Sequence, residues 1–131
     1  MIESIISMEL PAGGHLAIRR NRICPEQETK QCRRISLVSG IHGDELEGQY
    51  ICYETARRVK EHPEYLKGIV DIYPALNPLG IDMASRTVPR LEMDMNRMFP
   101  GDASGDMMER ITAAVVDSII AVSYTHLRAH E

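Results

Sequence analysis

The order of hydrophobic and polar positions in the first 30 residues predicts two short strands around a turn. Residues 5–10 and 15–18 are rich in apolar residues, and the Pro- and Gly-containing residues 11–14 between them favour a hairpin. Residues 21–31 are mostly polar and carry charges and a proline, which indicates a connection at the surface. We therefore expect residues 1–30 to form N-terminal strands and a connection.

The pattern then changes to that of a strand, a helix and a second strand. Residues 34–39 are a β-rich run that stops at Gly40, and residues 68–73 are a second apolar run. Between them, apolar side chains recur at near-helical spacing: Leu46, Tyr50, Tyr53, Ala56 and Val59. Strands joined by such a crossover pair in parallel, so residues 34–73 predict a βαβ unit and an α/β fold.

Residues 74–105 predict a long loop, because they are dense in Pro, Gly, Asn and Asp. Such a loop inside a compact domain is usually functional. Residues 104–120 return to a helical pattern, with Ser104 or Asp106 as the N-cap. One face of this helix carries Met108, Ile111, Val115 and Ile119.

Composition and charge exclude several classes of partner. The 131 residues fit one domain, and the net charge of −4 provides no basic surface for nucleic acid. No segment approaches the roughly 20 apolar residues of a membrane span, and the start does not resemble a signal peptide, so we expect a cytoplasmic protein without membrane contact. The three cysteines lack CxxC spacing and predict reduced structural thiols.

The chemically most informative segment lies where the first strand of the βαβ unit turns into the helix. Residues 40–48 read G-I-H-G-D-E-L-E-G and place His42 and Glu45 three positions apart. Imidazole nitrogen and carboxylate oxygen both bind Zn²⁺, and open α/β sheets bind ligands at the carboxyl ends of their strands. Gly43 allows a turn tight enough for both side chains to converge. On its own, the pair also fits a capping Glu and a surface His.

Further motifs follow in a fixed order in the long loop. They are N-P-L-G at residues 77–80, Arg86 ten positions before Asn96, and D-M-N-R-M-F-P-G at residues 94–101. In this combination, residues 34–120 resemble the succinylglutamate desuccinylase/aspartoacylase family. The resemblance implies an incomplete zinc-carboxypeptidase-like domain with a mixed, partly parallel sheet flanked by helices. It also implies hydrolysis of the amide of N-acyl amino acids such as N-succinylglutamate or N-acetylaspartate.

The resemblance assigns roles to five residues. His42 and Glu45 are expected to bind Zn²⁺, and Arg86 to stabilise the developing oxyanion. Asn96 and Arg97 are expected to hold a carboxylate of a small-molecule substrate, since a planar guanidinium binds carboxylate bidentately.

Structural interpretations compete with these roles. Solvated surface charge is the alternative for Arg86 and the favoured interpretation for Arg90. Asp94 is expected to brace the loop rather than react, and His15 and His62 to be ordinary surface residues.

The last ten residues have a different predicted origin. V-S-Y-T-H-L-R-A-H-E, residues 122–131, is what one reading frame of a transposase-type sequencing-library adapter encodes. We therefore expect native sequence to stop at Ile120, and residues 31–121 to be the N-terminal half of the hydrolase domain. His126, His130 and Glu131 are accordingly not counted as metal ligands.

The family places a third zinc ligand, a His, on the next strand and a general-base Glu later, and neither is expected in this chain. Because a catalytic zinc normally has three protein ligands, we expect weak zinc binding and no activity from residues 1–131 alone. Two other hypotheses stay open: a non-catalytic α/β module that binds an anionic metabolite at a helix N-terminus, and a partial fold without independent function. The acyl group, the amino acid and the oligomeric state are not predicted.

Overall fold

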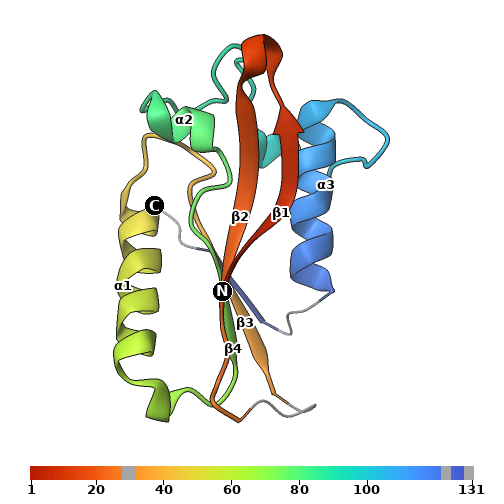
Figure 1. Ribbon diagram of the computed structural model, residues 1–131. Coiled ribbons are helices and arrows are strands. Elements are labelled where there is room, and N and C mark those ends of the chain that lie inside the picture. The colour runs from red at the N-terminus through yellow and green to blue at the C-terminus, as the bar shows by residue number, and fades with distance from the viewer. Residues whose placement is uncertain (28–31, 122–124, 129–131) are drawn as a thin grey trace.

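The computed structural model describes residues 1–27, 32–121 and 125–128, the last range by its backbone only. In these residues, one sheet has the strand order β1-β2-β4-β3-β5. Helices α1 and α3 lie on opposite sides of the sheet (Figure 1). No helix in the described ranges is both long and apolar enough to cross a membrane. The elements are β1 (Ile2–Glu9), β2 (His15–Ile23), β3 (Arg34–Val38), α1 (Glu47–Glu61), β4 (Ile69–Tyr73), α2 (Pro78–Asp82), α3 (Met107–Ile120) and β5 (Thr125–Arg128).

The predicted α/β fold with a mixed, partly parallel sheet is confirmed. Strands β3 and β4 pair in parallel, and α1 forms the crossover between them. Strands β1 and β2 form the predicted antiparallel hairpin, and β2 pairs with β4 in antiparallel orientation. The two strands of the βαβ unit, β3 and β4, therefore lie next to each other. Their carboxyl ends lie at the edge of the sheet that is near α2 (Figure 1).

Strand β2 is longer than its sequence indicates, so the surface connection begins later than predicted. The polar pattern places residues 21–23 in that connection, but they pair with β4 at Ile72, Asp71 and Val70. The polar residues in this stretch do not mark a loop, because Arg22 donates two hydrogen bonds to the fully buried carboxylate of Asp71. A charged residue in a strand is stable when a buried opposite charge faces it.

Helix α1 forms as predicted, but most of the apolar residues that suggested it face solvent. Tyr50 is 65% exposed and Tyr53 is 63% exposed, whereas Cys52 is buried. Cys52 packs with Val70 and Ile72 of β4, and Ala56 lies against the same cluster. The spacing therefore predicted the helix correctly, but of its apolar positions Ala56 packs on the sheet while the tyrosines do not, and the buried Cys52 was not among them.

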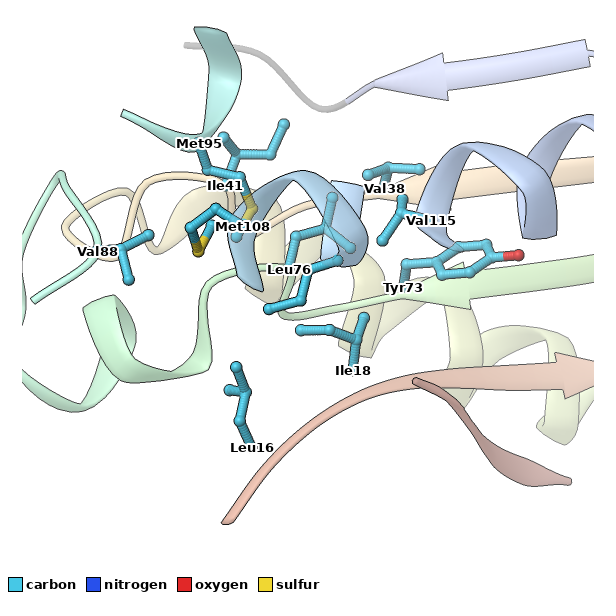
Figure 2. Packing of buried hydrophobic residues seen from close by; sticks show 11 residues of the cluster. Leu16, Ile18, Val38, Ile41, Tyr73, Leu76, Val88, Met95, Met108 and Val115 are labelled. Carbon is cyan, nitrogen blue, oxygen red and sulfur yellow. The ribbon is translucent and has the colours of Figure 1, made fainter. Parts of the chain in front are cut away.

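The larger hydrophobic cluster lies between the sheet and α3. Figure 2 shows side chains from β2, β4 and α3 pointing toward one another in this cluster. Of the two predicted N-cap candidates, Ser104 and Asp106, the helix uses Asp106, which forms a reciprocal capping box with Glu109. Met108, Ile111 and Val115 are buried as predicted, and Ile119 packs against the cluster from its edge.

The segment predicted as a long loop, residues 74–105, contains short ordered elements. Asn77 accepts a hydrogen bond from the Gly80 N–H at 2.8 Å and caps α2, with Pro78 as its first residue. Residues Met95–Arg97 form a 3₁₀ turn capped by Asp94. Two of the motifs in this segment are therefore helix starts, which explains their Asn, Pro and Asp residues.

Ion pairs and hydrogen bonds around the buried Asp71 connect the N-terminal hairpin to the rest of the domain. Arg22 binds Asp71 through Nε at 2.7 Å and Nη2 at 2.8 Å. Arg20, also on β2, forms an ion pair with Glu3 of β1. The hydroxyls of Tyr73 and Ser118 lie 2.9 Å apart and join β4 to α3. These contacts connect β1, β2, β4 and α3.

The predicted adapter origin of residues 122–131 stays a prediction. Residues 122–124 and 129–131, and with them His130 and Glu131, lie outside the described residues, and so does the side chain of His126. The backbone of β5 pairs in parallel with β3.

We expect Arg22→Met to destabilise the fold by about 3 kcal/mol, because it leaves the buried Asp71 carboxylate without its bidentate partner. The free energy of unfolding in urea measures the loss. Arg57→Met is the matched control: Arg57 pairs with Glu54 and Glu61 on the exposed side of α1. That variant should lose at most about 1 kcal/mol. Equal losses in both variants would contradict the account of the Asp71 pair.

Candidate functional site

The turn after β3 is shaped by two glycines. Gly40 has a φ of +70°, and a Cβ there would lie 2.8 Å from the carbonyl oxygen of Pro74. A Cβ on Gly43 would overlap the backbone of Gly80 in α2. The motif at residues 40–48 and the N-P-L-G motif at residues 77–80 are thus in direct backbone contact. This contact fixes the position of His42, which lies between Gly40 and Gly43.

The structure brings His42 and Glu45 together, as their spacing predicts. The imidazole of His42 is only 4% exposed. Its Nδ1 lies 2.9 Å from Oε1 of Glu45, and its Nε2 lies 3.1 Å from Oδ1 of Asp94. A buried ring with a carboxylate at each nitrogen is fixed in both position and orientation.

Sequence reasoning names Asp94 only as a brace of the loop and misses its contact with His42. Its predicted bracing role is confirmed, because Oδ1 accepts a hydrogen bond from the Asn96 N–H at 2.9 Å. Partial burial opposes its ionisation, but the Asn96 N–H and the His42 imidazole lower the pKa of Asp94 below its usual value. Asp94 is therefore a carboxylate that orients His42. Its place at the head of the D-x-N-R motif was the available signal.

Arg86 also reaches the pair, although 52% of its side chain is exposed. Its Nη1 donates a hydrogen bond to Oε1 of Glu45 at 2.9 Å. The Gly43 N–H donates to the carbonyl of Ser85 at 2.9 Å and so fixes the backbone next to Arg86. Arg86 is thus half exposed and paired with Glu45, and its expected role at the oxyanion stays a prediction.

Asn96 and Arg97 follow Asp94 in the 3₁₀ turn and are exposed. The side chain of Arg97 is 87% exposed, and its Nε lies 3.9 Å from Oδ2 of Asp94. The turn thus places a guanidinium at the edge of the site, and its role as a carboxylate ligand stays a prediction. Arg90, in the preceding loop, is exposed as expected, and so are His15 and His62.

The donor atoms fit part of a metal site. One imidazole nitrogen and one carboxylate oxygen converge, and both are ordinary zinc ligands. The second imidazole nitrogen contacts a carboxylate, which is the usual support of a metal-binding histidine. Across residues 1–27 and 32–121, no three His, Cys, Asp or Glu side chains form a group that could hold a metal ion.

The chain is similar in sequence to a known enzyme family. Residues 31–130 match the model of the succinylglutamate desuccinylase/aspartoacylase catalytic domain. Over 94 residues, the chain is 32% identical to an N-alpha-acetyl-L-2,4-diaminobutyric acid deacetylase from Halomonas elongata. This alignment covers 72% of the chain and 27% of that relative.

Solved structures show the same fold. A succinylglutamate desuccinylase/aspartoacylase from Rhodobacter sphaeroides is 29% identical with a TM-score of 0.75, and the match covers 90% of this chain and 35% of that one. A metallo-carboxypeptidase from Burkholderia cenocepacia is 14% identical with a TM-score of 0.71, covering 99% and 36%. The predicted carboxypeptidase-like fold is thereby confirmed, and the chain spans well under half the length of these proteins.

Gly43→Ala tests the contact between the first two motifs. The new methyl group would overlap the Gly80 carbonyl, so we expect a loss of about 2–3 kcal/mol in the free energy of unfolding. Gly13→Ala is the control, because Gly13 has a φ of +76° but open space around its Cβ position. Its cost should be about 1 kcal/mol, from the backbone alone. If Gly43→Ala cost no more than the control, the contact would not be a constraint.

Proposed function

Because the chain belongs to the succinylglutamate desuccinylase/aspartoacylase family, we propose that it is the N-terminal part of a zinc-dependent hydrolase that cleaves the amide of N-acyl amino acids. The observation that carries the proposal is the buried His42 imidazole, which faces Glu45 with one nitrogen and Asp94 with the other. The deacetylase similarity supports an acyl amide as the bond that is cleaved.

In this proposal, Nδ1 of His42 and the carboxylate of Glu45 hold the Zn²⁺. Asp94 accepts the Nε2–H of His42, which fixes the tautomer that leaves Nδ1 available as a ligand. When bound, Zn²⁺ polarises a scissile carbonyl and lowers the pKa of a bound water to ~7. The low pKa of Asp94 keeps this supporting carboxylate ionised at neutral pH.

The arginines supply positive charge around the reacting bond. Arg86 lies beside Glu45, where its guanidinium can donate to the oxygen on which charge develops. The exposed Arg97, with Asn96, binds a carboxylate of the substrate, for which the bidentate guanidinium geometry is suited. We propose a small carboxylate-bearing substrate, a cytoplasmic location and no nucleic-acid or membrane partner.

We propose that the third zinc ligand and the general base lie in a part of the full-length hydrolase that the described residues do not include. Residues 1–131 alone are then inactive and bind zinc weakly, since two protein ligands are one fewer than a catalytic zinc normally has. Tests of activity accordingly use the full-length hydrolase of which we propose this chain to be a part.

His42→Ala in the full-length protein should abolish stoichiometric zinc and lower kcat/KM for N-acetyl amino acids by at least about a thousandfold. Elemental analysis and steady-state kinetics measure the two effects. His62→Ala is the control, since His62 is exposed and contacts Glu64 away from the site. Wild-type protein without zinc would favour a metal-free binding module, and full turnover by His42→Ala would refute the zinc assignment.

Asp94→Asn should weaken zinc binding by about 10–100-fold, because an amide supports the His42 ring less well than a carboxylate. The substitution keeps an oxygen that can accept the Asn96 N–H, so the turn is retained. Competition with a chromogenic chelator measures the affinity. An unchanged zinc affinity would show that Asp94 only braces the loop.

A further inference from the structure

The buried side chain of Asn77 uses both ends of its amide, and it is only 1% exposed to solvent. Its Oδ1 accepts a hydrogen bond from the Gly80 N–H at 2.8 Å and caps α2. Its Nδ2 donates a hydrogen bond to the carbonyl oxygen of Thr87 at 3.3 Å. A helix N-cap needs a side-chain oxygen, which aspartate or serine would supply equally well. The amide nitrogen therefore has a second task, and this task lies at Thr87.

The contact with Thr87 bears on Arg86, its neighbour in the chain. Neither Arg86 nor the residue on either side of it belongs to a helix or a strand, so contacts with other segments determine where its backbone lies. On one side, the carbonyl of Ser85 accepts a hydrogen bond from the Gly43 N–H at 2.9 Å. On the other side, Asn77 holds the carbonyl of Thr87. Arg86 thus lies between two anchored residues.

We propose that Asn77 is a positioning residue of the hydrolase: its amide nitrogen keeps the backbone of Arg86 beside the turn that carries His42 and Glu45. The inference rests on the proposed function, in which Arg86 stabilises the oxyanion. Asn77 is not itself a catalytic residue, because both ends of its amide contact other residues of the chain. It acts through Thr87 on Arg86.

The backbone of Asn77 joins the same arrangement to the end of β3. Its N–H donates a hydrogen bond to the carbonyl of Gly40 at 2.7 Å, and its carbonyl accepts one from the Ile81 N–H at 3.0 Å. Gly40 begins the turn that leads to His42. Asn77 therefore contacts the turn after β3, the first turn of α2 and the segment that carries Arg86, so these three segments share one point of attachment.

Gly80 leaves the space that the Asn77 side chain needs. A Cβ on Gly80 would lie 2.2 Å from Nδ2 and 2.9 Å from Oδ1 of Asn77. A larger residue at this position would push the amide away from its partners. Capping of α2 alone requires no such close fit on the nitrogen side. The asparagine and the glycine of the N-P-L-G motif thus serve one arrangement.

Asn77→Ser in the full-length hydrolase separates the two tasks of the amide, because the hydroxyl keeps a cap oxygen and puts nothing in the place of Nδ2. We expect kcat for N-acetyl amino acids to fall about 10–100-fold, with KM changed by less than about twofold, since a displaced Arg86 weakens the transition state and not substrate binding. Asp106→Ser is the matched control: it also leaves a hydroxyl at a helix N-cap, that of α3, and should leave kcat unchanged.

A double-mutant cycle with Arg86→Gln shows whether the effect passes through Arg86. If it does, the double variant has the kcat of Arg86→Gln alone. Losses that multiply in the double variant, or an unchanged kcat in Asn77→Ser beside an impaired Arg86→Gln, overturn the positioning role and leave the proposed function standing. An Arg86→Gln variant as active as wild type contradicts the proposed role of Arg86 and the inference together.

Crystal structures of the wild type and of Asn77→Ser give a readout that does not depend on activity. We expect the backbone of Arg86 to shift by about 1 Å in the variant while α2 stays capped, and an unmoved Arg86 overturns the inference. If Asn77→Ser does not fold, Asn77→Asp at alkaline pH replaces it and is judged by the same outcomes. Its ionised carboxylate keeps the cap oxygen but turns a second oxygen, without a proton, toward the Thr87 carbonyl.

Discussion

The arrangement of the candidate site depends on the burial of the His42 imidazole between the carboxylates of Glu45 and Asp94. His42 is nearly inaccessible to water, and it meets Glu45 from its own turn and Asp94 from a segment 52 residues further along the chain. A polar ring in such a position is stable only when both nitrogens have partners. The glycine contact at the end of β3, the cap of α2 and the Asp94 turn all serve to bring these partners to it.

The sequence predicts those parts of the fold that depend on residues close together along the chain. The hairpin, the parallel βαβ unit and the Asp106 cap all follow from short-range spacing. The buried face of α1 does not follow from this spacing. Tyr50 and Tyr53 are largely apolar yet face solvent, and the small side chains of Cys52 and Ala56 pack on the sheet. The end of β2 was missed because its polar residues are explained only by Asp71, a buried charge on another strand.

In the candidate site, too, contacts between residues close in sequence were predictable and contacts between distant residues were not. His42 and Glu45 share one turn, so their convergence follows from the local sequence. Asp94 and Arg86 reach that turn from the following segment, and no local pattern determines a contact over 41 or 52 positions. The family resemblance supplied Arg86 as a candidate, but neither the resemblance nor the spacing indicated that it binds Glu45. Such contacts depend on the packing of α2 against Gly43.

Anomalous diffraction at the zinc absorption edge, from crystals of the full-length protein purified without chelator, tests the account most directly. The account predicts one strong peak within bonding distance of both Nδ1 of His42 and the carboxylate of Glu45, with Asp94 still bound to Nε2. No peak at this position, or a zinc ion held elsewhere in the protein, would contradict it.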